Sequence, residues 1–183
     1  LNSKFKQINF KIIKPLNILS ENILRTDWNE VIKSIKKNWD NKFDGILSVF
    51  ALEFIEDIDI FFAESNRILK KGGVLIISTT HPLGAFEWDA ETKNLLVTDY
   101  FNPPIEIWRE QGQSNPGVTY FRTIEELFSK ISENGFTVKK LMEPKPLGPN
   151  NENSSPYKGS YWTEFRDRLH SVPFAVVIKA IKG

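Results

Sequence analysis

Residues 43–78 constrain the fold of this 183-residue chain more than any other segment, because they combine two strand patterns with one helix pattern. The segment GILSVFAL, residues 45–52, is a nearly unbroken apolar run, typical of a strand covered on both faces. From Asp57 to Lys71 the apolar side chains recur at helical spacing, and they are Ile58, Phe61, Phe62, Ile68 and Leu69. The segment VLIIS, residues 74–78, predicts a second buried strand. A strand, a helix and a strand in this order predict a right-handed crossover between parallel strands, and therefore an α/β fold.

The two ends of this predicted helix carry signals of their own. Asp57 suits the positive N-terminal end of the helix dipole, and Lys70 and Lys71 suit its negative end. Gly72 and Gly73 follow, and glycine readily takes the left-handed backbone conformation that closes a helix. We therefore expect the helix to reach Lys71.

The segment before residue 43 predicts one strand and one helix. FKII, residues 10–13, has the pattern of a short strand that Pro15 stops. Residues 27–39 predict a helix, because Asp27 can cap it and Glu30 follows three residues later.

The segment after residue 120 predicts the closing part of the sheet. Thr123 and Glu126 form the capping-box pattern of a helix that ends before Gly135. FTVKKLME, residues 136–143, and PFAVVIKAIK, residues 173–182, predict two closing strands, with a short helix near 161–169 between them. Because no long crossover separates the two strands, we expect antiparallel pairing at a sheet edge.

Residues from about 82 to 120 differ from the rest of the chain. They are rich in proline, glycine, asparagine and aromatic residues, with short apolar pieces such as NLLVTDYF and IEIW. We interpret them as an insertion of short strands and loops within a single domain that spans residues 1–183.

Composition excludes several classes of function. A formal charge of +1 gives no general case for a nucleic-acid partner or an anionic membrane surface. No apolar run approaches the roughly 20 residues that span a bilayer. The absence of cysteine excludes disulfides, Cys-ligated zinc and thiol nucleophiles, and it fits a reducing, cytoplasmic location. The first residue is Leu1, so we expect the chain to be a fragment.

Six pieces of the chain occur in the order and at the spacing of a known family: FDGILSVFALEFIED, NRILKKGG, VLIISTTHP, YFRTIEEL, NGFTVKKLMEPKP and PFAVVIKAIK. On these pieces the chain resembles the class I S-adenosylmethionine-dependent methyltransferases of the small-molecule type, similar to the methyltransferase type 11 group. The resemblance is close over residues 43–146 and looser at both ends. It implies a Rossmann-like sheet of parallel strands with an antiparallel last strand. It also implies S-adenosyl-L-methionine as cofactor and a small-molecule methyl acceptor as substrate, with no metal required in general. The composition gives no reason to expect nucleic acid or a membrane as a partner.

Two cofactor-binding features of that family have no counterpart in this chain. One is a GxGxG turn after the first strand, and the other is an acidic residue that ends the second strand. No glycine precedes Gly45, and the first acidic residue is Glu21. We therefore expect an N-terminally truncated domain that lacks the family's first two strands, with FKII as the third. The inferred activity is then that of the parent protein, and the chain alone is expected to be unstable or inactive.

The resemblance implies which residues border the cofactor. In the family, the end of the fourth strand flanks the cofactor, and a residue just past the third strand contacts its adenine. The matching positions are Asn17, Ser48, Val49, Phe50 and Leu52.

The substrate side is predicted from the same comparison and from side-chain chemistry. Glu53 is the carboxylate at the cleft edge, aromatic residues of the insertion suit an apolar acceptor, and one arginine matches an arginine common in the family. These candidates are Glu53, Tyr100, Trp108, Tyr120 and Arg122. Each also has a structural interpretation, as a filler of the insertion's own small core or as a solvated charge.

His81 is the candidate general base, because it follows the fifth family strand and imidazole titrates near neutral pH. A lone histidine is nevertheless more often structural. Many relatives have a histidine directly before the arginine that matches Arg122, whereas this chain has Phe121. Glu143 matches the glutamate that ends the sixth family strand, and we expect it to pair with Arg122.

Two other functions remain as alternatives. A non-catalytic, methyltransferase-like binding module would explain the missing glycine turn without truncation, and the upstream coding sequence distinguishes the two cases. A nicotinamide-dependent oxidoreductase shares the doubly wound architecture, but the Tyr-x-x-x-Lys pair of one such class is absent in a suitable place. For the methyl acceptor, the sequence leaves quinone-like, phenolic and amine compounds open.

Overall fold

The computed structural model describes residues 39–109, 116–146 and 165–183. The predicted strand at 10–13, almost all of the predicted helix at 27–39 and the cofactor candidate Asn17 lie outside these residues.

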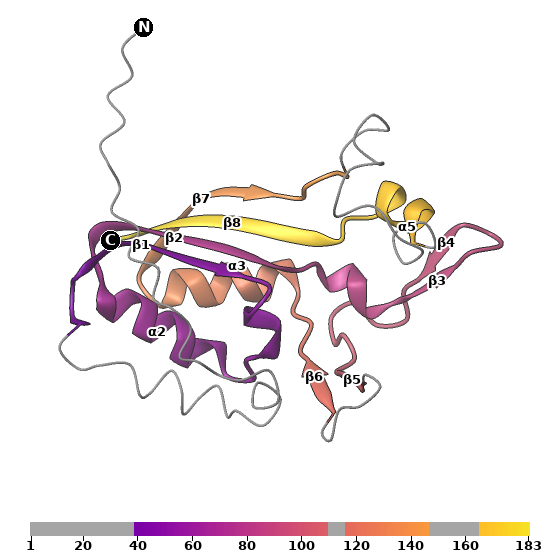
Figure 1. Cartoon of the computed structure of the whole chain (residues 1–183), viewed down its shortest axis with the longest axis horizontal. Coiled ribbons are helices and arrows are strands. Elements are labelled where there is room, and N and C mark those ends of the chain that lie inside the picture. Colours follow the sequence, from indigo (N-terminus) through magenta and orange to yellow (C-terminus); the bar gives the residue numbers. More distant parts are fainter. Residues whose placement is uncertain (1–38, 110–115, 147–164) are drawn as a thin grey trace, which may run out of the picture.

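A four-stranded mixed sheet forms the centre of the structure (Figure 1). Its order is β1-β2-β8-β7, with β1 at Phe43–Val49, β2 at Leu69–Thr80, β8 at Ala175–Lys182 and β7 at Phe136–Met142. β1 and β2 are parallel, whereas β8 is antiparallel to both β2 and β7. The predicted mixed α/β sheet with an antiparallel last strand is therefore confirmed.

Helix α2, Ile58–Ile68, makes the predicted crossover between the two parallel strands. Asp57 caps it, because the Oδ1 atom of Asp57 accepts hydrogen bonds from the N–H groups of Asp59 at 3.0 Å and Ile60 at 3.4 Å. The predicted C-terminal end was wrong by three residues, since the helix stops at Ile68 and β2 begins at once with Leu69.

The two glycines after the helix act as a bulge within β2 instead of a helix stop. The partner of Phe43 is Leu69, but the partner of Gly45 is Val74, so four residues of β2 lie opposite one residue of β1. Gly72 has the predicted left-handed conformation, with φ at 75°. A Cβ atom on Gly73 would lie 2.7 Å from the carbonyl oxygen of Lys70, so this tight bend requires glycine.

Helices α2 and α3, the latter at Ile124–Glu133, cover the same face of the sheet (Figure 1). The hydroxyl of Thr123 caps α3 as predicted, by accepting from the N–H of Glu126 at 3.1 Å. The core lies between these helices and the sheet, where Phe62 and Ile131 are fully buried against alternate residues of β2 and β8. Their exclusion from water stabilises the layer that positions the strand ends.

Short elements follow β2, where the sequence predicts short strands and loops. The 3-10 helix η4, Pro82–Ala85, leads into an antiparallel pair of β3, Glu87–Asp89, and β4, Asn94–Leu96. A second antiparallel pair joins β5, Glu106–Trp108, to β6, Gly117–Thr119. The last helix, α5 at Arg166–Ser171, lies at the same end of the sheet as β3 and β4 (Figure 1).

Candidate functional site

The carboxyl ends of β1 and β2 meet at one edge of the sheet, because the two strands are parallel and adjacent. β1 stops at Val49, and Phe50 takes a left-handed backbone conformation with φ at 45°, which is uncommon for a bulky residue. The N–H of Phe50 still donates to the carbonyl oxygen of Ser78, at 2.8 Å, so the chain turns while it remains attached to β2. The sequence predicts a strand up to residue 52, and this turn is the reason that the strand is shorter.

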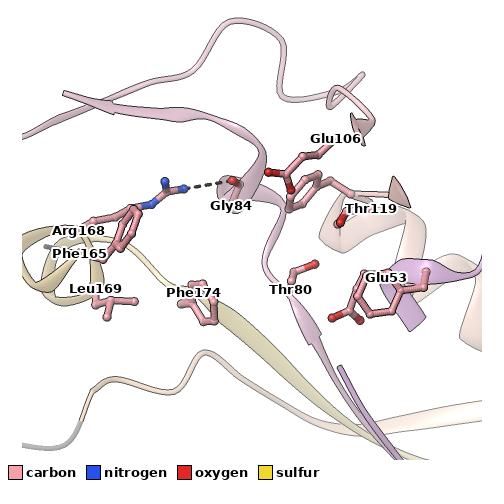
Figure 2. Close-up of a pocket in the computed structure, with 11 residues that line it drawn as sticks. Glu53, Thr80, Gly84, Glu106, Thr119, Phe165, Arg168, Leu169 and Phe174 are labelled. Carbon is pink, nitrogen blue, oxygen red and sulfur yellow. Dashed lines mark hydrogen bonds between the residues drawn. The ribbon is translucent and has the colours of Figure 1, made fainter. Parts of the chain in front are cut away.

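A cavity of about 300 Å³ opens beside this edge (Figure 2). Its polar lining comes from four segments: the 3-10 helix η3 at Leu52–Phe54, the end of β2, the β5–β6 pair and α5. The polar side chains are those of Glu53, Thr80, Glu106, Thr119 and Arg168.

The rest of the cavity wall is largely aromatic. Its side chains are those of Phe54, Phe121, Phe165, Leu169 and Phe174, and Gly84 contributes backbone. The ring of Phe121 limits Gly84, where a Cβ atom would lie 3.0 Å from it. The cavity is therefore mainly apolar with a few polar groups, which is the usual composition of a small-molecule site.

Glu53 is the most buried acid of this wall, with 3% of its surface exposed. Its Oε2 atom accepts a hydrogen bond of 3.0 Å from the hydroxyl of Thr79. Burial raises the pKa of Glu53, whereas its own backbone N–H, the hydroxyl of Thr79 and the charge of Arg122 act in the opposite direction. A buried carboxyl with a raised pKa that faces a cavity can accept a proton or hold a polar group of a ligand.

Arg122 fixes the loop that carries Glu53. Its guanidinium donates hydrogen bonds to the carbonyl oxygens of Leu52 at 3.4 Å, Tyr120 at 3.3 Å and Glu56 at 2.8 Å, and to that of Ile55. It also lies 3.7 Å from the Oε1 atom of Glu126. The prediction that Arg122 pairs with Glu143 was wrong, and Arg122, predicted to bind substrate, does not line the cavity.

His81, the candidate base, has both ring nitrogens engaged. Its Nδ1 atom accepts from the N–H of Leu83 at 3.1 Å and thereby caps η4. Its Nε2 atom lies 3.0 Å from the Oε1 atom of Glu143, so the neutral ring must carry its proton on Nε2 and donate it there. His81 is 3% exposed and does not line the cavity. These contacts favour the structural interpretation, in which His81 joins the loop after β2 to the end of β7.

The His81 contacts predict a pH dependence of stability. Burial lowers the pKa of His81, an effect that Glu143 partly offsets. The unfolded chain then binds more protons at acidic pH, so the free energy of unfolding falls as the pH drops below about 6.5. Asparagine at this position keeps the cap but does not titrate. We expect His81→Asn to reduce the loss of stability between about pH 7.5 and about pH 5.5, measured by denaturant unfolding. An identical loss in both proteins would contradict this assignment.

The other predicted substrate residues do not line the cavity. The indole N–H of Trp108 donates to the hydroxyl of Thr119 at 3.0 Å, and its ring packs on Phe54 with centroids 6.4 Å apart. Tyr120 lies under the guanidinium of Arg122, 5.6 Å from its ring centroid, and Tyr100 packs on the neighbouring ring of Phe101. Of the five substrate candidates, the structure brings Glu53 to the cavity.

The predicted cofactor residues separate into covered and exposed side chains. Leu52 is a core residue at 1% exposure and Ser48 is 8% exposed, so neither side chain offers much surface to a cofactor. Val49 and Phe50, in contrast, are 54% and 40% exposed at the end of β1. Phe50 also packs on Phe174 of the cavity wall, with ring centroids 6.3 Å apart.

Several residues of the cavity were missed from the sequence. Glu106, Phe165, Arg168 and Phe174 come from segments far apart in the chain, and no local pattern distinguishes them. Phe121 had a usable signal, since it lies between the candidates Tyr120 and Arg122, just after β6.

Residues 39–109, 116–146 and 165–183 hold neither a metal-ligand cluster nor a membrane-spanning helix. No group of three or more His, Cys, Asp or Glu residues is placed to hold a metal ion. No helix in this part of the chain is long and apolar enough to cross a bilayer.

Comparison with known proteins gives a consistent result. Residues 29–77 match the family model of a methyltransferase domain. The chain is 26% identical over 154 residues to an uncharacterised protein of Haemophilus influenzae, in an alignment covering 78% of the chain and 55% of that protein. It is 37% identical over 59 residues to the ubiquinone biosynthesis O-methyltransferase of Pelagibacter ubique, covering 32% of the chain and 24% of that enzyme.

Two solved structures share the arrangement of strands and helices. A Listeria monocytogenes protein assigned as an S-adenosylmethionine-dependent methyltransferase superposes with a TM-score of 0.64 and 25% identity, covering 83% of this chain and 66% of that one. An S-adenosylmethionine-dependent methyltransferase of Mesorhizobium loti superposes with a TM-score of 0.60 and 20% identity, covering 78% and 63%. The chain thus spans about half of the Haemophilus protein and slightly less than two thirds of the two solved structures.

Proposed function

Because the chain has the fold of the class I S-adenosylmethionine-dependent methyltransferases, we propose that its protein transfers a methyl group from S-adenosyl-L-methionine to a small-molecule acceptor. One observation carries this proposal: the cavity opens where the parallel strands β1 and β2 end. Ligands of open α/β sheets bind in the crevice outside the carboxyl ends of such strands. A cavity of about 300 Å³ suits an acceptor of small size.

The residues at the end of β1 fit one wall of a cofactor site. Val49 and Phe50 present apolar surface at this edge, and such surface suits a flat ring system. The left-handed backbone of Phe50 is a strained feature of the kind found at functional sites. Val49 and Phe50 would therefore hold the cofactor, which supplies the methyl group.

The contact between Phe50 and Phe174 connects this wall to the cavity. Phe174 lines the cavity, so an acceptor bound there would lie next to a cofactor held at Phe50. Methyl transfer is an in-line displacement, and its rate depends on holding the two reactants in position and excluding water. The phenylalanine rings exclude water, and Glu53 orients the polar group of the acceptor.

The proposal extends to location. The absence of cysteine from the sequence fits a reducing compartment, and we place the protein in the cytoplasm on this basis.

The proposal is tested by a transfer assay on the full-length protein. The protein is incubated with S-adenosylmethionine carrying a labelled methyl group and a panel of amine, phenolic and quinone-like compounds. We expect label in a small-molecule product. If the panel is unlabelled and S-adenosylmethionine shows no calorimetric binding, the enzyme assignment is wrong and a non-catalytic binding module is favoured.

Substitution of Phe50 by asparagine links this activity to the end of β1. Asparagine tolerates the left-handed conformation better than phenylalanine, so the fold should be kept while the apolar wall is lost. We expect the KM for S-adenosylmethionine to rise about tenfold or more. The matched control is Phe101→Asn, because Phe101 is 83% exposed and lies outside the cavity. Equal effects of the two changes would contradict a role for Phe50.

A further inference from the structure

Two carboxylates line the cavity. Glu53 comes from η3 and Glu106 from β5, and Figure 2 shows the carboxylate of Glu106 beside Gly84 and that of Glu53 below Thr80. Glu53 in particular makes the cavity a poor site for an anionic ligand, because this carboxylate is 3% exposed and like charges repel strongly where water is excluded, whereas Glu106 is exposed.

The cationic side chain of the lining is directed at the wall. The Nη2 atom of Arg168 donates to the carbonyl oxygens of Leu83 at 3.1 Å and Gly84 at 3.2 Å. Figure 2 shows this guanidinium turned toward Gly84, with the carboxylate of Glu53 on the far side of the cavity. Arg168 thus holds the loop after β2, and the Glu53 side of the cavity is acidic.

The rest of the lining suits the same kind of ligand. Four phenylalanines surround the cavity: Phe54, Phe121, Phe165 and Phe174. The faces of aromatic rings attract cations, and they also pack well on flat apolar groups. A buried carboxylate beside aromatic rings is therefore complementary to a protonated amine on an apolar frame.

Glu53 favours such a ligand through its environment. It is 3% exposed, and the hydrogen bonds to its side chain come from neutral groups, the hydroxyl of Thr79 and its own backbone N–H, with the charge of Arg122 as a smaller influence. A buried carboxylate gains more from a cationic partner than an exposed one does, because the pair interacts through a medium of low dielectric constant.

We propose that the cavity binds a small cationic amine, with its nitrogen at Glu53 and its apolar frame among the four phenylalanines, while Glu106 adds a second negative charge to the lining. As a statement about the methyl acceptor, this rests on the proposed function. As a statement about ligand preference, it rests on the cavity alone.

The arrangement also accounts for the proton that an amine acceptor must lose. A protonated amine has no free electron pair, so Glu53 first takes one proton from the nitrogen. The freed pair then forms the new N–CH3 bond while the S–CH3 bond of S-adenosylmethionine breaks, and the sulfonium leaves as a neutral thioether. The raised pKa of Glu53 supports this role as a proton acceptor.

Three probes that share a phenyl ring and differ in the charge of their polar group test the preference for a cationic ligand: benzylamine, benzyl alcohol and benzoate. Their binding to the protein is measured without any methyl donor, by ligand-detected NMR titration. We expect benzylamine to bind about tenfold more tightly than benzyl alcohol, and benzoate to bind more weakly than both. Glu53→Gln should remove about a factor of ten from the benzylamine preference, and Glu106→Gln a smaller factor.

Glu87→Gln is the matched control, since Glu87 is an exposed glutamate of β3 outside the cavity. The proposal is overturned if no probe binds, if benzoate binds as tightly as benzylamine, or if Glu53→Gln and Glu106→Gln change nothing more than Glu87→Gln does. Amine binding without methyl transfer would contradict the proposed function and support the ligand preference. Methyl transfer to phenols, together with no preference for amine binding, would support the proposed function and overturn the ligand preference.

Discussion

Replacement of Arg122 by methionine is expected to lower the free energy of unfolding by about 3–5 kcal/mol. Arg122 is 8% exposed, and its guanidinium donates to carbonyl oxygens of the loop that carries Glu53, at residues 52, 55 and 56, and to that of residue 120. Methionine fills part of the space but donates no hydrogen bond, so these acceptors are left in a poorly hydrated site. The loop that carries Glu53 should then loosen, and denaturant unfolding at neutral pH measures the loss.

Arg67→Met is the matched control for this change. Arg67 pairs with Glu64 at 2.7 Å and with Asp40, but its side chain is 28% exposed at the surface of α2. Surface ion pairs contribute little, so we expect a loss below about 1 kcal/mol. Equal losses for Arg122→Met and Arg67→Met would show that Arg122 does not hold the loop.

Replacement of Glu53 by glutamine is expected to lower methyl transfer about a hundredfold or more while it raises stability at neutral pH. Burial raises the pKa of Glu53, so the folded protein binds this proton more tightly than the unfolded chain does. The stabilisation from that proton is fully present below the ordinary value of 4.5 and is lost as the pH rises through the raised pKa. This stabilisation is therefore reduced at neutral pH, whereas glutamine has the same shape and stays neutral at every pH.

The measurement compares the two proteins at about pH 4 and at about pH 7.5 by denaturant unfolding. Glu53→Gln should raise the free energy of unfolding at the higher pH and change it little at the lower pH. The control Glu87→Gln should change neither the methyl-transfer activity nor the pH dependence of the free energy of unfolding. A Glu53→Gln protein with unchanged transfer and lower stability at neutral pH would contradict both the proton-acceptor role and the burial argument.

The sheet could be predicted because its signals are local. The apolar run before residue 50, the stripe of α2 and the cap at Asp57 each depend on residues close in sequence, and the structure confirms the parallel crossover. The end of α2 was mispredicted because Leu69 pairs with Phe43 in the sheet, and this pairing competes with another helical turn. The pattern of neighbouring residues does not reveal a strand pairing with a residue 26 positions away in the sequence.

The candidate site shows the same division more sharply. Glu53 was identified because it follows β1 directly, at the strand end where a cleft is expected. Glu106, Arg168 and Phe174 were missed because packing of the β5–β6 pair and α5 against the strand ends brings them together. The partner of Glu143 was mispredicted for a related reason. Glu143 directly follows β7, and tertiary packing places His81 beside it instead of Arg122.

The sequence by itself determined the strand–helix–strand unit, the caps of α2 and α3 and the class of fold, because spacing and capping act over a few residues. The tertiary structure decided the chemistry of the cavity. Arg122, a predicted ligand contact, became a support for the loop through four carbonyl groups, and Glu53 gained a raised pKa by burial. Burial and partner choice depend on segments that meet only when the sheet and its short strands have packed, and they give the same residue types different roles.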